Sequence, residues 1–412
     1  MRKVFVVDEY ASSKQNGVGT FRGSLIACLR GAPVEVNLLS FNAEEAEFGV
    51  QRKEGYVVWH IPPHGRGGFL ENGMLSLSLL RLYVSDHKDH VFFVSHSPCL
   101  NFLKALKTLF PKSQRVFVIH DQGWTAPLLG NRDRLKALMT MKRLPAAERQ
   151  TYASVKRYVR EERRMYNMAH RVVCLCRSTH ALLQEVYRVP QEKLALMHNG
   201  LPCEPRALSR VERERLRAKL GVRPSERVLL FVGRTVQAKG IHELLDAFEE
   251  LWQEDQNLRL VVAGQVFRLD SFASRTPRSV YGVTYAGFLA PERLAEWYQV
   301  ADLGVLPSYT EQCSYTALEM MLYRVPIVTT DGNGLGDMFA DGQDALVVPA
   351  SPLSLAENLK GAIRKMLSLA PAARSLMTEA AFKKLERDYS EVGMKKNYQH
   401  LLANLWGAEH EA

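Results

Sequence analysis

The sequence predicts an α/β protein built from two doubly wound domains, each with a mostly parallel sheet. Three observations predict this class. The chain has 412 residues, which is long for a single ordinary α/β core. Short apolar runs alternate with helical patterns in both halves, and this alternation stops once, near the middle. Ligands of such sheets bind at the carboxyl ends of the strands, so we expect the site in a cleft between two facing domains.

The first half contains short apolar runs of the kind that form buried strands, with helical patterns such as Phe102–Leu109 between several of them. The runs are Val4–Val7, Val34–Phe41, Tyr56–Ile61, Val91–His96, Val116–His120 and Val172–Cys176. Strands that alternate with helices predict a parallel sheet covered on both faces.

The pattern breaks at Asn199–Ser209, where one glycine and two prolines fall close together. It then resumes with five predicted strands and two clear helices. The strands are Val228–Val232, Leu258–Ala263, Leu303–Leu306, Pro326–Thr330 and Ala345–Val348, and the helices are Ile241–Trp252 and Pro291–Tyr298. We therefore predict one domain over residues 1–201, a second over 202–388, and a last segment over 389–412 that holds an amphipathic helix from Tyr389 to about Leu405.

Composition and hydropathy favour a cytoplasmic protein. Hydrophobic residues make up 46% of the chain and charged residues 24%, which is ordinary for a globular protein. The first apolar run, Val4–Val7, ends at Asp8 and is too short for a signal peptide. Apolar stretches of about 20 residues, which a membrane span needs, are missing. The six cysteines include no C-x-x-C pair, which argues against a zinc site and fits a reducing compartment. Cys174 and Cys176 read as core residues that alternate along one strand.

The net charge of +10 is partly local, because residues 131–164 hold eleven Lys or Arg against four Asp or Glu. One interpretation is a solvated helix face. Another is a patch that meets anionic lipid headgroups or a phosphate-bearing acceptor, as a peripheral contact at the inner face of the membrane. Nucleic acid is a weaker third interpretation, since no nucleic-acid motif accompanies the charge, and we expect no nucleic-acid partner.

Two cations mark the loop that follows the predicted strand Val228–Val232. Gly233-Arg234 and Lys239-Gly240 stand between that strand and the helix at Ile241. A helix start offers backbone N–H groups and the positive end of a dipole. Arg and Lys held there suit a diphosphate, although two surface cations beside a turn remain the alternative.

Two acids frame the next candidate, the run from Glu311 to Glu319 after the strand Leu303–Leu306. A carboxylate accepts several hydrogen bonds and suits the hydroxyls of a sugar or a ribose. Backbone N–H groups of Cys313, Ser314 and Tyr315 can face a phosphate at the start of the following helix. The alternative is a Glu that merely favours the helix dipole.

The first half offers a glycine loop and a histidine. We expect Asn16–Thr20, with Gly17, Val18 and Gly19 at its centre, to form a loop before a helix from Phe21 to Leu29, because glycines let the backbone approach a ligand. The G-x-G-x-x-G pattern fails, since Arg22 replaces its last glycine, and this lowers the case for a dehydrogenase.

His120 ends a predicted strand and is expected to point into the site, where it can hydrogen-bond donor or acceptor. A purely structural histidine is the alternative there. His96, also at a strand end, and His64, in a glycine-rich loop, are weaker candidates.

These motifs, in this order, resemble the retaining GT-B glycosyltransferases, the group that includes glycogen synthase-like enzymes and bacterial mannosyl- and glucosyltransferases. The resemblance is strongest over Leu229–Phe248, Val283–Met321 and Val325–Pro349. It implies two Rossmann-like domains facing across a cleft, with the acceptor on the first domain and the nucleotide sugar on the second. The last helix is expected to cross back to the first domain.

The resemblance also implies roles for the candidate residues. Arg234 and Lys239 match residues that hold the donor diphosphate, Glu311 matches an acid that contacts the donor sugar, and Glu319 matches one that contacts the ribose. His120 matches a histidine near the transferred sugar. The segment Gly17–Gly19 matches a loop that closes on the diphosphate or the acceptor.

Two positions depart from the pattern of the family. Gln312 and Asn16 stand where many members have glycine, which leaves the exact donor contacts and the identity of the sugar open.

The predicted activity is retaining transfer of a sugar from a nucleotide-diphosphate donor to a saccharide or lipid-linked acceptor, in cell-surface polysaccharide or glycoconjugate synthesis. Neither a cofactor nor a metal is expected. A sugar-nucleotide epimerase of the same fold, a non-catalytic partner subunit and a basic nucleic-acid binding module are the alternatives.

Overall fold

The structure is a computed structural model, and it describes residues 2–9, 17–41, 47–63, 72–95, 99–141, 148–204, 208–265, 275 and 278–407. The chain forms two compact units. Unit 1 comprises Met1–Gly200 and Glu391–Ala412, and unit 2 comprises Leu201–Ser390. The two units are described separately below.

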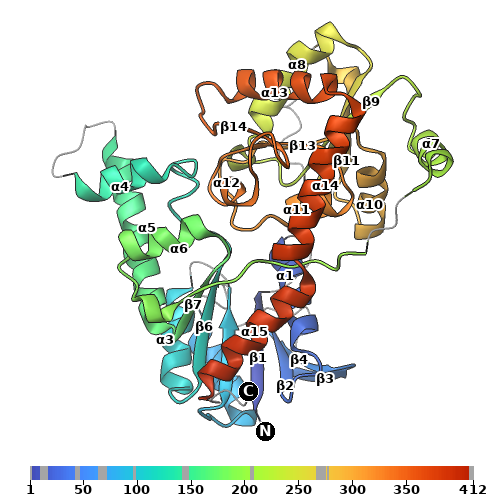
Figure 1. Cartoon of the computed structure of the whole chain (residues 1–412). Helices are drawn as coiled ribbons and strands as arrows, with labels where there is room; N and C mark the ends of the chain where they lie inside the picture. Colours follow the sequence, from blue (N-terminus) through green and yellow to red (C-terminus); the bar gives the residue numbers. More distant parts are fainter. Residues whose placement is uncertain are drawn as a thin grey trace. The chain divides into compact units, whose positions relative to one another are not determined.

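Unit 1 is built on an eight-stranded sheet with the order β3-β4-β2-β1-β5-β6-β7-β8 (Figure 1). Neighbouring strands pair in parallel, except that β3 is antiparallel to β4. The strands are β1 (Lys3–Glu9), β2 (Glu35–Phe41), β3 (Gly49–Lys53), β4 (Tyr56–Ile61), β5 (His90–Val94), β6 (Gln114–Ile119), β7 (Arg171–Cys174) and β8 (Leu194–Leu196).

Helices cover both faces of this sheet. They are α1 (Gly17–Leu29), α2 (Gly73–Tyr83), α3 (Leu100–Leu109), α4 (Arg132–Thr140), α5 (Arg149–Met168), α6 (Arg177–Glu185), the short η3 (Gln191–Lys193) and α15 (Glu391–Leu405). On one face Phe92 belongs to the same buried cluster as Phe102 of α3 and Val159 of α5. On the other face the neighbouring Phe93 meets Tyr398 of α15, with ring centroids 5.9 Å apart. Adjacent strand residues thus point to opposite layers, which is why these strands are apolar throughout.

Unit 2 has a six-stranded parallel sheet with the order β11-β10-β9-β12-β13-β14. Its strands are β9 (Arg227–Val232), β10 (Leu258–Ala263), β11 (Val283–Gly287), β12 (Leu303–Leu306), β13 (Ile327–Thr330) and β14 (Leu346–Val348). Its helices are α7 (Arg210–Lys219), η4 (Gln237–Lys239), α8 (Ile241–Glu254), η5 (Val280–Gly282), α10 (Pro291–Val300), α11 (Tyr315–Leu322), α12 (Leu335–Met338), α13 (Leu355–Ser368) and α14 (Pro371–Asp388).

The strand order of unit 2 reverses at β9. From β9 the chain first moves outward through β10 and β11 and then returns to place β12 on the opposite side of β9. Such a switch point separates the loops that leave two adjacent strands and opens a ligand crevice at their carboxyl ends. The two parallel sheets with their helical layers confirm the predicted α/β class.

Some elements were not predicted from the sequence, and the strand predicted to include Cys176 ends earlier. Strands β3, β8 and β11 all lie at sheet edges, where partial exposure removes the continuous apolar run that marks a central strand. Cys176 does not continue the strand that holds Cys174, because β7 ends at Cys174 and Cys176 stands immediately before α6. Both thiols are nevertheless buried. Among the helices of the described ranges, none has the length and apolarity that a membrane crossing requires.

Candidate functional site

The loop after β9 carries the first pair of predicted cations. It passes Gly233 and Arg234, makes the single turn η4, and enters α8 through Gly240. Gly240 has φ +64°, and a Cβ atom there would lie 2.0 Å from the carbonyl oxygen of Pro307. Only glycine fits this position without displacing the chain. The glycine therefore allows the β9 loop to pack directly against the loop that follows β12.

The loop after β12 carries the first predicted acid. The backbone N–H of Glu311 donates to the carbonyl oxygen of Asn333 over 2.7 Å. Gly334 has φ +84°, and a Cβ atom there would come within 2.4 Å of the carbonyl oxygen of Glu311. The segment after β13 thus packs against the backbone of Glu311 and fixes its position. Our sequence reasoning did not single out Asn333 or Gly334, although the Gly332-Asn333-Gly334 run is a visible turn signal.

The structure brings Lys239 and Glu311 together. The ammonium of Lys239 forms an ion pair with Oε1 of Glu311, and the hydroxyl of Ser308 donates to the same oxygen over 3.0 Å. The side chains of Lys239 and Glu311 are only 21% and 15% exposed, so the pair is more protected from solvent screening than a surface salt bridge. The other oxygen of Glu311, Oε2, accepts no hydrogen bond from the described part of the chain.

Arg234 lies in the same loop and is exposed. Within the ranges that the structure describes it forms no ion pair. The β9 loop therefore presents one cation already paired with a carboxylate and a second one that faces solvent.

Helix α11 begins beside Glu311. The side chain of Ser314 caps this helix by accepting a hydrogen bond from the N–H of Ala317 over 3.4 Å. Cys313, Ser314 and Tyr315 are buried. The start of α11 thus lies at the same edge of the sheet as Lys239, which agrees with the predicted strand–loop–helix order.

Glu319, the second predicted acid, lies within α11, and its surroundings differ from those of Glu311. Its Oε2 accepts a hydrogen bond of 2.6 Å from the hydroxyl of Tyr298 on α10. Burial raises the pKa of Glu319 to about 7, and the hydrogen bond from Tyr298 opposes this rise. Our sequence reasoning did not identify Tyr298, since a tyrosine at the end of an amphipathic helix is ordinarily a packing residue.

In unit 1 the predicted glycine loop is part of a helix. Helix α1 begins at Gly17, so Gly17, Val18 and Gly19 form its first turn, and the expected start at Phe21 was wrong. Two glycines have low helix propensity and favoured a loop. Burial of Gly19, Phe21 and Leu25 within unit 1 outweighs that preference. Asn16 lies outside the described residues.

His120 follows β6 and contacts α1. Its ring meets that of Phe21 edge-on, with centroids 4.5 Å apart. The structure thus brings His120 close to the helix whose first turn holds Gly17 to Gly19. The other two histidine candidates, His64 and His96, lie outside the described residues.

Glu162 supports the loop after His120 and was missed by our sequence reasoning. Its Oε1 accepts from the backbone N–H of Gly123 over 2.6 Å, and its Oε2 accepts from the hydroxyl of Tyr187. Burial raises the pKa of Glu162 to about 7, against the effect of these two hydrogen bonds. The available signal was an acid at helical spacing from the apolar Val155 and Val159 of α5.

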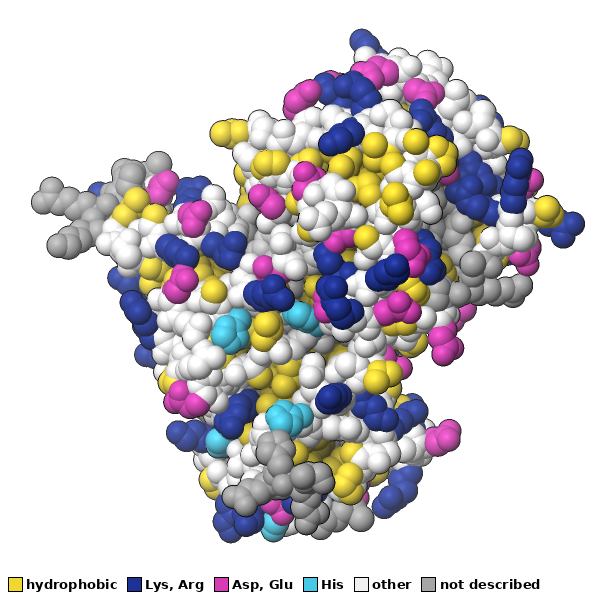
Figure 2. Space-filling view, viewed as in Figure 1, with side chains coloured by type: hydrophobic (Ala, Val, Ile, Leu, Met, Phe, Trp, Pro, Cys, Tyr) yellow, Lys and Arg dark blue, Asp and Glu magenta, His cyan; other side chains and the backbone are white. Residues whose placement is uncertain are grey.

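The basic segment forms α4 and α5, separated by residues outside the described ranges. Lys156, Arg157 and Arg160 of α5 are exposed. Figure 2 shows Lys and Arg side chains along the side of unit 1 where these helices lie. Clusters of three or more metal-ligating side chains are absent from the residues described here.

Comparisons with known proteins agree with these motifs. A family profile described as "Glycosyl transferases group 1" matches residues 212–384, and one described as "Glycosyl transferase 4-like domain" matches residues 16–200. The chain belongs to the group 1 glycosyltransferases. The resemblance predicted from the residues of the β9 and β12 loops is thereby confirmed.

Among its relatives, this group 1 glycosyltransferase is 29% identical over 179 residues to the putative teichuronic acid biosynthesis glycosyltransferase TuaC of Bacillus subtilis, covering 43% of this chain and 44% of TuaC. The matched stretches span about half the length of such curated relatives.

Solved structures resemble the group 1 glycosyltransferase over its whole length. Sucrose-phosphate synthase from Thermosynechococcus elongatus has a TM-score of 0.76 at 16% identity, covering 99% of this chain and 100% of that one. Anabaena HepE in complex with UDP and glucose has a TM-score of 0.69 at 15% identity, covering 98% and 100%. At these identities the likeness establishes the fold, which is the predicted GT-B fold.

Proposed function

We propose that this group 1 glycosyltransferase is a retaining enzyme that moves a sugar from a nucleotide-diphosphate sugar to a saccharide or lipid-linked acceptor. The observation that carries the proposal is the Lys239–Glu311 pair, held between the loops of β9 and β12 beside the start of α11. A cation, an acid and a helix N-terminus at one switch point suit a donor with a diphosphate and a sugar. The complex of HepE with UDP and glucose supports a nucleotide-sugar donor.

The role of the cations follows from the charge that develops during transfer. As the bond between the anomeric carbon and the diphosphate oxygen breaks, negative charge grows on the leaving nucleoside diphosphate. Arg234, Lys239 and the N–H groups at the start of α11 (Cys313, Ser314 and Tyr315) would stabilise that charge. Fixed cations and helix amides can do this without a metal, so we propose a metal-independent reaction.

The proposed step forms the new glycosidic bond on the face that the diphosphate leaves. The acceptor hydroxyl oxygen bonds to the anomeric carbon while the bond to the diphosphate oxygen breaks, and the hydroxyl proton passes to the leaving phosphate oxygen. Configuration is retained, and no side chain of the chain acts as nucleophile.

The acids would orient the donor. Glu311 would bind hydroxyls of the donor sugar, and Glu319 would bind the ribose, as carboxylates accept several hydrogen bonds. Because Lys239 pairs with Glu311, a diphosphate would compete with Glu311 for the ammonium. That exchange would free Glu311 for the sugar.

Unit 1 would supply the remaining contacts. His120 would approach the transferred sugar, and the first turn of α1 (Gly17 to Gly19) would offer backbone N–H groups to the diphosphate or the acceptor. The name of TuaC, in teichuronic acid biosynthesis, supports a role in cell-surface polysaccharide synthesis. Peripheral contact with anionic membrane through α5 would suit a lipid-linked acceptor.

The direct test is a thermal-shift screen of the full chain against UDP, GDP, ADP, CMP and a dTDP-sugar, with and without magnesium. A ligand that binds only the folded state raises its stability by mass action. We expect one diphosphate nucleotide to raise Tm, with or without magnesium. Lys239→Ala should abolish the shift, whereas Lys365→Ala, which removes an exposed lysine of α13, should keep it.

The remaining outcomes decide between this proposal and its alternatives. Absence of a shift for every nucleotide in a well-folded sample would argue for a non-catalytic subunit. Conversion of a nucleotide sugar into its epimer with no acceptor present would argue for an epimerase. A shift that Lys239→Ala leaves intact would refute the diphosphate role of Lys239.

A further inference from the structure

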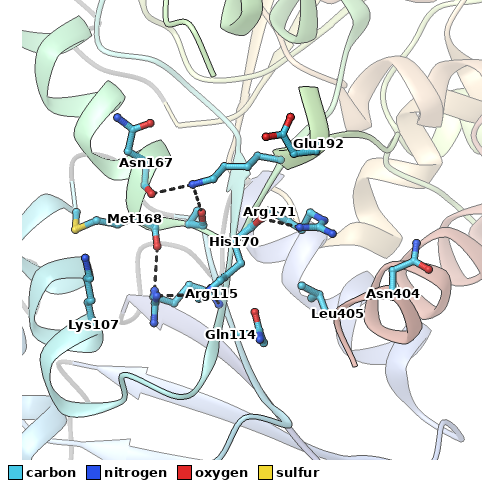
Figure 3. Close-up of a pocket in the computed structure, with 12 residues that line it drawn as sticks. Lys107, Gln114, Arg115, Asn167, Met168, His170, Arg171, Glu192, Asn404 and Leu405 are labelled. Atoms are coloured by element: carbon cyan, nitrogen blue, oxygen red, sulfur yellow. Dashed lines mark hydrogen bonds between the residues drawn. The ribbon is translucent and has the colours of Figure 1, made fainter. Parts of the chain in front are cut away.

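A polar hollow of about 430 Å³ opens at the amino ends of β6 and β7 (Figure 3). It lies at the edge of the first sheet opposite to His120, because β6 runs from the hollow at Gln114 to Ile119 before His120. At about 3.3 Å per residue, this separates the hollow from His120 by roughly 20 Å. The hollow is therefore distinct from the proposed transfer site.

Cations from four separate elements line this hollow. They are Lys107 of α3, Arg115 of β6, Arg171 of β7 and Lys193 of η3. None of these four forms an ion pair within the ranges that the structure describes, and Glu192 is the one acid in the lining. Gathering like charges that have no acidic partner costs free energy, and a bound anion would lower that cost.

The side chains of His170 and Arg115 approach each other through nitrogen atoms that both carry hydrogen. The backbone N–H of Arg115 donates to Nδ1 of His170 over 3.0 Å, so the neutral ring carries its proton on Nε2. That nitrogen lies 3.4 Å from Nη2 of Arg115, which is also a donor. Two N–H groups therefore point at the same space, and an anion oxygen can accept from both. Figure 3 shows the two side chains meeting in the hollow.

Lys193 also has an N–H donor available for an anion. Its ammonium donates to the carbonyl oxygens of Asn167 and Ala169 over 2.9 and 3.0 Å, which orients it at the end of α5. An ammonium has three donors, so one remains for a ligand. Similar carbonyl contacts, to Met168 and Ser113, hold the buried guanidinium of Arg115.

We propose that this hollow binds a phosphate group, as free inorganic phosphate or as the monoester group of a small phosphorylated molecule. Arg115, His170 and Lys193 each bring an N–H donor to its lining, and Arg171 and Lys107 add two further cations. Its volume lies in the range of small-molecule sites, about 300–1,000 Å³. Phosphate offers more acceptor oxygens than a carboxylate and suits several donors from different directions.

The electrostatics of the hollow agree with this assignment. Burial, followed by the charges of Arg115, Lys193 and Arg171, lowers the pKa of His170 to about 4. Burial also lowers the pKa of Lys193, and the neighbouring arginines contribute to that shift. The surroundings thus disfavour further positive charge and favour an anion.

The test is calorimetric titration of inorganic phosphate into the full chain at constant ionic strength. We expect saturable binding, and Arg171→Gln and Lys193→Gln should each raise Kd by about tenfold, as expected for loss of one charge-assisted hydrogen bond. Lys104→Gln, at an exposed position of α3 that does not line the hollow, should leave Kd unchanged. Circular-dichroism melts of each variant establish that it is folded.

Two further arms separate the alternatives. The proposed donor site also attracts phosphate, so the titration is repeated with Lys239→Ala, which weakens that site. Phosphate binding to the hollow should persist in this variant. Failure of the hollow proposal can therefore be told apart from failure of the proposed function. Flotation with vesicles containing phosphatidic acid separates a lipid source from a soluble one, because only a lipid source makes flotation depend on Arg171. Equal phosphate affinity in the wild type and both hollow variants, or no binding at all, would overturn the proposal.

Discussion

Tyr298 of α10 donates its hydroxyl hydrogen to Oε2 of Glu319 on α11 over 2.6 Å. The two side chains join neighbouring helices at a carboxyl group whose pKa is raised to about 7 by burial. The ring of Tyr298 also stacks on that of Tyr323, with centroids 5.5 Å apart. The position of Glu319 therefore depends on a residue that precedes it by 21 positions.

We expect Tyr298→Phe to lower the free energy of unfolding by about 1–2 kcal/mol, because the carboxyl group of Glu319 loses its donor while it stays largely enclosed. Urea denaturation measures the change. Tyr323→Phe is the matched control, since it removes the hydroxyl of the stacked partner and keeps both rings. Equal losses in the two variants would contradict a specific role for the Tyr298 hydrogen bond.

Glu162 predicts a pH dependence of stability. Its pKa in the folded state is about 7, raised by burial from an ordinary value of 4.5, so the folded protein binds the proton more tightly than the unfolded chain. The stability associated with this proton is fully present below about pH 4.5 and is lost as the pH rises towards and through 7. In size this amounts to roughly 3 kcal/mol.

Glu162→Gln removes this titration and should flatten that part of the profile. The measurement is urea denaturation at several pH values between 4.5 and 8, with the difference between wild type and variant plotted against pH. Glu161→Gln changes the neighbouring acid on α5 and serves as control. A constant difference across the range would show that Glu162 has no raised pKa.

Gly240 is predicted to tolerate no side chain. Gly240→Ala adds a methyl group 2.0 Å from the carbonyl oxygen of Pro307 at φ +64°, and we expect a loss of about 2 kcal/mol or more. Gly361→Ala is the matched control, because no atom outside its own helix lies within 4 Å of the added methyl. In the interior of α13 it should stabilise by about 0.5–1 kcal/mol. Thermal denaturation of both variants measures these changes in stability.

Lys239→Ala should lower turnover by about two to four powers of ten, as expected when a group that stabilises a leaving diphosphate is lost. The assay follows release of the nucleoside diphosphate at saturating donor and acceptor. Glu311→Gln and the double variant complete a cycle. Because Lys239 and Glu311 contact each other, the losses should be clearly non-additive. Near-normal turnover of Lys239→Ala would exclude the assigned role.

The exposed cations of α5 predict membrane binding. Neutralising Lys156, Arg157 and Arg160 to Gln should reduce flotation with anionic vesicles by about tenfold or more, at about 1 kcal/mol for each charge near the surface. The control neutralises Arg210, Arg215 and Lys219 on α7, which removes the same charge from exposed positions elsewhere. Equal flotation of the two triple variants would count against a membrane role for α5.

The candidate residues of the β9 and β12 loops were predictable because their signals are local. An apolar run followed by Gly233, or by Pro307, places the next residues at the carboxyl end of a strand, whatever the rest of the chain does. The first turn of α1 was mispredicted for the opposite reason. Local propensity opposed a helix at Gly17, and burial against the rest of unit 1 decided it.

By itself, the sequence determined the α/β class, the positions of the central strands along the chain and the residues at their ends, since each is encoded within a few consecutive positions. Only the tertiary structure decided which of these residues meet. Lys239 and Glu311 are 72 positions apart, and the cations of the hollow come from four elements between Lys107 and Lys193. Such contacts depend on strand order and on close backbone approaches like that of Gly240 to Pro307, which no local pattern contains.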